Sequence, residues 1–165
     1  LNVVTDSVIL WLKAQEEVNG KIKRLFICDH MPHSLSSSHF EEFFFPYVFR
    51  IFKEFPESIK LYHNEGNVLH VLSRIADLGA DIFHFGVDIK KAKETIGETV
   101  CLMGNLDPVN LLLKGKPEQI LRECKRCINI ASPGGGYLLS TAGGLAPGTP
   151  RKNVKAMVDS VKSSI

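Results

Sequence analysis

Residues 81–108, DIFHFGVDIKKAKETIGETVCLMGNLDP, decide how this chain is expected to fold. The segment contains two short apolar runs, Asp81–Phe85 and Thr99–Met103, and a helical stretch over residues 88–97 lies between them. Short continuous apolar runs are typical of strands that are buried on both faces, and a helical connection between two such strands indicates a parallel pair. The segment therefore predicts one strand–helix–strand unit with parallel strands.

The same pattern continues in both directions along the chain. Further strands are expected over Arg24–Cys28, Ile59–Tyr62 and Tyr137–Ser140, and helices over residues 3–18, 39–55, 67–79, 117–131 and 150–163. Pro46 should kink or divide the helix over 39–55. Five strands separated by helices, without a hairpin signal, predict an α/β fold with a parallel sheet. It would be either a doubly wound sheet or part of a (β/α)8 barrel, since a whole barrel needs about 250 residues.

Composition excludes several classes of protein. Of 165 residues, 44% are hydrophobic and 23% are charged, which is typical of a soluble globular protein and argues against disorder. The net charge of +2 argues against electrostatic binding of nucleic acid, and no apolar run reaches the roughly 20 residues of a membrane helix. The N-terminal stretch LNVVTDSVILWL lacks a basic region and does not resemble a signal peptide. Because the chain begins with Leu1, we expect it to be part of a longer protein, and we treat 1–165 as one domain.

The four cysteines do not indicate a disulfide scaffold. Cys28 and Cys101 lie in apolar runs, where a cysteine is usually a small buried hydrophobic residue. Cys124 and Cys127 form a CxxC within a helical stretch, with no second CxxC and no histidine nearby, so packing is favoured over zinc or redox chemistry. This usage predicts a reduced, cytoplasmic protein.

The unusual residues lie in the loops that follow the strands. These loops read DHMP at 29–32, HNEG at 63–66, GNLD at 104–107 and TAGG at 141–144. Ligands bind at the carboxyl ends of the strands in both candidate architectures, so these loops are the expected site. Neither a GxGxxG nor a Walker A sequence is present to hold a nucleotide phosphate.

Four stretches resemble, in the same order, the uroporphyrinogen decarboxylase superfamily, which includes corrinoid-dependent methyltransferases. They are DHMPHSLSSSHFEEFFFPY at 29–47, LYHNEGN at 61–67, MGNLDPVNLLLKG at 103–115 and GGYLLSTAGGLAPGTPRKNVKAMVDSV at 135–161. The resemblance implies a (β/α)8 TIM barrel, of which this chain would be the C-terminal part with about five βα units.

Two departures from the family pattern concern the metal site. The resemblance implies that the methyltransferases hold zinc with the His and Cys of a His-x-Cys motif and with a later Cys near the last strand. This chain keeps His63, but Glu65 stands at the first Cys position and Gly143 at the second. The decarboxylase has a His at the latter place, so Gly143 departs from both branches.

His63 and Glu65 are nonetheless candidate metal ligands. Residues i and i+2 of an extended chain point to the same side, and both residue types bind zinc. A third ligand would have to come from elsewhere, with Asp29 and His30 as candidates. Replacing a thiolate by a carboxylate would make the metal more Lewis-acidic. The alternative is a hydrogen bond between His63 and Glu65 at a polar strand end.

The remaining candidates follow from their loop positions. Asp29 and His30 are the candidate catalytic residues, although Asp29 could instead form an Asx-turn. The candidate substrate-binding residues are Asn105, Asp107 and Gly143, although Asp107 also suits a helix cap. His84 alternates with Phe83 and Phe85 and therefore points away from both, into the barrel or out of it.

Three functions remain open from the sequence. The first is a corrinoid-dependent methyltransferase, with possible Zn2+, that moves a methyl group from a small donor such as a methyl ether to a cobamide protein. The second is a metal-free porphyrinogen decarboxylase-like lyase that acts on a tetrapyrrole, and the third is a non-catalytic binding member of the family. Open sheet edges predict that the isolated chain pairs with a second copy or belongs to a longer protein.

Overall fold

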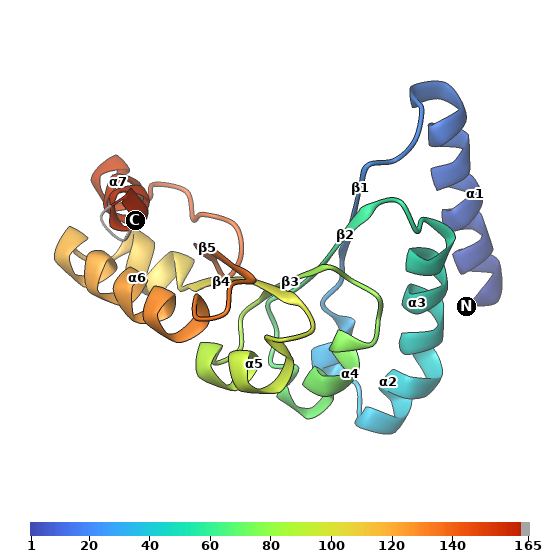
Figure 1. Ribbon diagram of the computed structural model, residues 1–165, viewed down its shortest axis with the longest axis horizontal. Helices are drawn as coiled ribbons and strands as arrows, with labels where there is room; N and C mark the ends of the chain where they lie inside the picture. The colour runs from blue at the N-terminus through green and yellow to red at the C-terminus, as the bar shows by residue number, and fades with distance from the viewer. Residues whose placement is uncertain (163–165) are drawn as a thin grey trace.

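The computed structural model describes residues 1–162, which form one parallel sheet with helices along one side of it (Figure 1). The five strands are β1 (Arg24–Cys28), β2 (Ile59–Asn64), β3 (Ile82–Phe85), β4 (Cys101–Leu106) and β5 (Tyr137–Thr141). They lie in the order β1-β2-β3-β4-β5, and all four pairings are parallel. This in-order arrangement is that of neighbouring strands in a barrel, not of a doubly wound sheet.

Helices lie between successive strands as the sequence predicts, with α1 before β1 and α7 after β5. They are α1 (Asn2–Asn19), α2 (Ser37–Phe43), α3 (Phe45–Glu54), α4 (Leu72–Ala76), α5 (Ile89–Ile96), α6 (Pro117–Ala131) and α7 (Arg151–Lys162). Short helical turns occupy Met31–Ser34, Leu69–Val71 and Pro108–Leu113. Pro46 divides α2 from α3 and lies in the first turn of α3, where its missing N–H costs nothing. None of the helices in residues 1–162 is long and apolar enough to cross a membrane.

Some element bounds differ from the sequence prediction. The predicted helix over 67–79 is reduced to a short turn followed by α4, which ends before Gly79 with its positive φ of 84°. Strand β2 continues two residues beyond Tyr62, and β4 continues three residues beyond Met103. Parallel hydrogen bonding to the neighbouring strands carries these residues, which single-sequence patterns assigned to loops. The last residue of the predicted helix over 150–163 lies outside the described residues.

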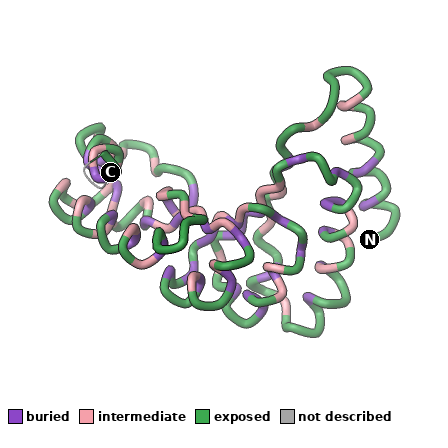
Figure 2. Tube along the Cα trace, in the orientation of Figure 1, coloured by how far each residue is buried: buried purple, intermediate pink, exposed green. Residues whose placement is uncertain are grey.

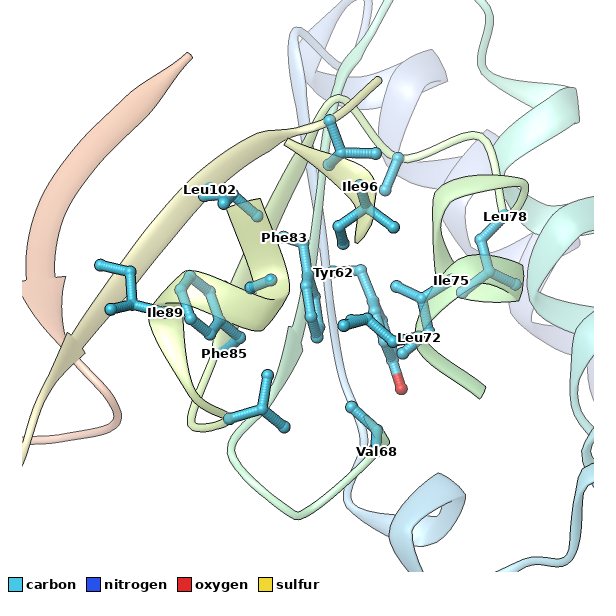
Figure 3. Close-up of a cluster of buried hydrophobic side chains, with 14 of the residues drawn as sticks. Tyr62, Val68, Leu72, Ile75, Leu78, Phe83, Phe85, Ile89, Ile96 and Leu102 are labelled. Carbon is cyan, nitrogen blue, oxygen red and sulfur yellow. The ribbon is translucent and has the colours of Figure 1, made fainter. Parts of the chain in front are cut away.

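The core lies between the sheet and the helices (Figure 3). Tyr62, Phe83 and Leu102 stand on three neighbouring strands and are fully buried. The rings of Tyr62 and Phe83 stack with their centroids 5.7 Å apart, and Ile75 from α4 packs in the same cluster. Alternate residues of each strand point to opposite faces, so the residues between these core positions face the other side of the sheet.

That other side is the open face, which we define by Phe26, His63, His84, Met103 and Leu138. None of the described helices covers it in Figure 1, and Figure 2 shows buried segments where strands meet helices. The open face is apolar at its edges, where Phe26 is 60% exposed and Leu138 is 46% exposed. A closed barrel would place this face in its interior.

Candidate active site

Three metal-ligand side chains meet where β1 and β2 end. Cys28 and His63 are register partners on these strands, and His30 follows β1 by two residues. One ligand atom from each of the three lies within 4.8 Å of the other two. The parallel register produces this meeting, because it places the carboxyl ends of β1 and β2 side by side.

The sequence prediction that Cys28 is a buried hydrophobic residue is wrong. Cys28 is exposed, because it ends an edge strand and points to the open face together with Phe26. Cys101, on the same face, is partly buried, whereas Cys124 and Cys127 are fully buried on α6 as predicted. Cys28 is therefore accessible to a ligand, and the cysteines of the CxxC pack in the core.

His63 is the buried member of the cluster. Its exposure is 8%, and burial together with the neighbouring His84 holds the pKa of His63 below its usual value. The imidazole is consequently neutral at neutral pH, which is the form that binds metals.

His84 connects His63 to the end of β5. The Nδ1 atoms of His63 and His84 are 2.9 Å apart, and His84 Nε2 is 2.6 Å from the carbonyl oxygen of Thr141. Strand alternation left open whether His84 points into the barrel or out of it. In the structure His84 faces the interior of the barrel segment and contacts His63, a candidate ligand.

Glu65 extends across the same strand ends toward Gly143. Its Oε1 lies 4.0 Å from His30 Nε2, and its other oxygen, Oε2, occupies the space that a side chain at position 143 would need. A Cβ built on Gly143 would overlap Oε2 and lie 3.0 Å from the Glu65 carboxyl carbon. Glu65 and Gly143, the two positions that depart from the family pattern, therefore fit together in space, because the Glu65 carboxylate occupies the room that a glycine leaves.

Asp29 and His30 sit at the turn after β1. Asp29 Oδ1 accepts a hydrogen bond from the backbone N–H of Met31 at 2.6 Å, which is an Asx-turn. The Asp29 carbonyl oxygen accepts one from the side-chain amide of Asn64 at 2.8 Å. These bonds hold the turn that presents His30 to the cluster, and the catalytic role expected for Asp29 stays a prediction.

Asn105 and Asp107 end the same sheet but face a different cleft. Asn105 Nδ2 donates to the carbonyl oxygen of Val87, and both candidates line a cleft of about 300 Å3 beside α5 and α6, with Arg122 on its wall. Asp107 Oδ1 accepts from two backbone N–H groups at the start of the turn over Pro108–Leu113, as a helix cap does. Although partial burial opposes ionisation of Asp107, hydrogen bonds from the following residues hold its pKa below the usual value. Their substrate-binding role stays a prediction.

Sequence reasoning missed Cys28 as a member of the cluster and His84 as the neighbour that contacts His63. A signal for Cys28 was present, since Cys28 and His30 have the i, i+2 spacing by which two side chains at a strand end can converge. No local signal distinguished the inward direction of His84.

The family model of uroporphyrinogen decarboxylase (URO-D) matches residues 1–164. The chain belongs to this family. Its similarity to a uroporphyrinogen decarboxylase from Dechloromonas aromatica is 33% identity over 174 residues, covering 99% of this chain and 47% of the relative. Its similarity to a methylated-thiol–coenzyme M methyltransferase from Methanosarcina mazei is 29% identity over 167 residues, covering 99% and 44%.

A solved structure shows the same fold. A methyltransferase from Methanosarcina mazei superposes with a TM-score of 0.82 at 28% sequence identity, covering 99% of this chain and 48% of that one. The chain thus spans about half the length of the relatives it matches. The fold expectation is confirmed: the five βα units are an α/β segment of a TIM-barrel-like fold, within a family of enzymes that includes decarboxylases and methyltransferases.

Proposed function

We propose that the protein containing this chain is a metal-dependent methyltransferase that transfers a methyl group from a small donor to a cobamide-carrying protein. The observation that carries the proposal is the convergence of Cys28, His30 and His63 at the carboxyl ends of β1 and β2. Active sites of TIM barrels lie at this end of the strands. The similarity to the methyltransferases from Methanosarcina mazei supports the reaction class.

The three side chains fit zinc by their chemistry. One sulfur and two imidazole nitrogens are ordinary zinc ligands, and catalytic zinc sites use three protein ligands with a fourth position left open. The metal prediction from the sequence placed His63 and Glu65 in the site. We retain His63, and we propose Cys28 and His30 beside it, because Glu65 is not part of the three-residue group found in residues 1–162.

The charge of this ligand set bears on the methyl donor. A bound zinc ion would supply Lewis acidity at this edge of the sheet. One thiolate and two neutral imidazoles carry a single negative charge between them, so they neutralise a divalent cation only in part. Such a set favours polarising an oxygen-bound methyl group over holding a second thiolate. We therefore propose a methyl ether as donor, and the oxygen that loses its methyl group takes up a proton from solvent.

The metal assignment is tested by zinc content. The full-length protein should retain about one zinc ion per chain after dialysis, as a three-ligand site predicts. Cys28→Ser and His63→Gln should lose the metal, whereas Cys101→Ser and His70→Gln serve as matched controls and should keep it. Unchanged zinc content in both site variants would refute the site.

The reaction is tested with free cob(I)alamin in place of the corrinoid protein. Incubation with an aryl methyl ether should convert it to methylcobalamin, followed by its visible spectrum, and His63→Gln should abolish the conversion. The second candidate function, porphyrinogen decarboxylation, is favoured by the 33% identity to the Dechloromonas decarboxylase. If metal-free protein consumed uroporphyrinogen as fast as metal-loaded protein, and neither transferred a methyl group, decarboxylation would be the function instead.

A further inference from the structure

We propose that His84 is a positioning residue that determines which ring nitrogen of His63 carries the proton. The inference deepens the proposed function, on which it rests, because a metal at Cys28, His30 and His63 needs one unprotonated nitrogen of His63. It is carried by two distances, the 2.9 Å between the Nδ1 atoms of His63 and His84 and the 2.6 Å from His84 Nε2 to the Thr141 carbonyl oxygen.

The proton positions follow from which groups can donate a hydrogen bond and which can only accept one. A carbonyl oxygen can only accept a hydrogen bond, so His84 Nε2 must carry a proton. The Nδ1 of a neutral His84 is then a bare acceptor, and the bond between the two rings requires that His63 Nδ1 donates. His63 Nε2 is consequently left with a free lone pair, which is the atom available to a metal.

The surroundings support this chain of hydrogen bonds. His63 and His84 are register partners on β2 and β3, so the backbone ladder holds their rings together. Thr141 ends β5, and its hydroxyl donates to the carbonyl oxygen of Gly143 in the following turn. The acceptor for His84 is thus a main-chain group in an ordered turn, which side-chain rotation cannot remove.

The expected consequence is a preorganised ligand. Metal-bound histidines commonly donate their second ring N–H to a hydrogen-bond acceptor, and that partner sets the tautomer and the ring orientation. Here the partner is a second histidine whose own tautomer is determined by Thr141. Replacing such a partner typically lowers metal affinity by 10–100-fold.

Nuclear magnetic resonance reads the tautomer directly. Long-range 1H–15N correlation spectra of the metal-free full chain, labelled with 15N-histidine, separate protonated from bare ring nitrogens. We expect His63 to show a protonated Nδ1 and a bare Nε2, with its signals assigned by their loss in His63→Gln. A protonated Nε2 on His63 in the unmodified protein would overturn the proposal, and this measurement depends on no variant of His84.

Variants of His84 test causation. His84→Phe keeps a ring of similar size without an acceptor, and it should return His63 to the Nε2–H tautomer and weaken zinc binding by 10–100-fold. His84→Gln restores a side-chain oxygen acceptor and should recover part of the affinity. His39→Phe, at an exposed position on α2, is the control and should change neither property.

The outcomes separate this inference from the proposed function. An unchanged tautomer of His63 in His84→Phe, or zinc affinity within twofold of the unmodified protein, would refute the positioning role. The Nδ1–H tautomer in a protein that binds no zinc would uphold the role of His84 and refute the metal-dependent function.

Discussion

Gly143→Ala tests the close fit between Glu65 and the loop after β5. The new Cβ would overlap Glu65 Oε2 and lie 3.0 Å from its carboxyl carbon, so the Glu65 side chain must move. The clash involves the far end of a flexible side chain that is 46% exposed, which leaves the carboxylate free to turn toward solvent. We therefore expect a modest loss of stability and not a failure to fold.

The magnitude follows from the cost of moving one side chain. A side chain forced away from its preferred rotamer costs about 0.5–1.5 kcal/mol. In a domain of this size, 1 kcal/mol lowers the midpoint of thermal unfolding by about 2–4 °C. Glu65→Ala removes the obstructing carboxylate, so Gly143→Ala should cost almost nothing in that background. The two substitutions should show a coupling energy of about 1 kcal/mol, as contacting residues do.

Thermal unfolding followed by circular dichroism, applied to both single variants and the double variant, measures this coupling. Gly144→Ala is the matched control, because no described atom lies within 4 Å of a Cβ built there. It should leave the midpoint unchanged. Effects of Gly143→Ala and Glu65→Ala that add within about 0.3 kcal/mol would show that the carboxylate does not occupy the space beside Gly143.

Three further predictions concern the core, the thiols and the open face. Phe83→Ala should lower the free energy of unfolding in urea by about 3–5 kcal/mol, since Phe83 is fully buried, while Phe26→Ala, at 60% exposure, should change it by no more than about 0.5 kcal/mol. Iodoacetamide at pH 8 should alkylate the exposed Cys28 well before Cys127, because burial raises the pKa of the Cys127 thiol to about 11. Equal alkylation rates of the two cysteines by mass spectrometry would contradict this. Added zinc should protect Cys28, and an unchanged rate of Cys28 alkylation with zinc would contradict that. The isolated 165-residue chain should self-associate in light scattering, because β1 and β5 each pair with one strand within residues 1–162 and the open face is apolar; a stable monomer at high micromolar concentration would contradict this.

Local sequence determined the elements of this fold and their order. Apolar runs such as Arg24–Cys28 became strands because their alternate residues pack against the helices while the backbone pairs with a neighbouring strand, and Pro46 divided two helices because it lacks a backbone N–H. These signals act within a few residues and need no tertiary context. The sequence predicted a longer helix over 67–79 than the structure contains. Its apolar residues pack on the sheet from a short turn and a single short helix, so their spacing did not require one continuous helix.

Which residues make up the site depends on the register of the strands. The sequence located His63 and His30 near the carboxyl ends of strands, but the meeting of Cys28 with them depends on how β1 pairs with β2. His84 faces inward and bonds to Thr141, which is 57 positions away in the sequence. Glu65 fits over Gly143, which is further still along the chain. Such contacts depend on which strands are neighbours and on how far each one extends, and both are set by hydrogen bonding and packing across the whole sheet, so only the tertiary structure decides them.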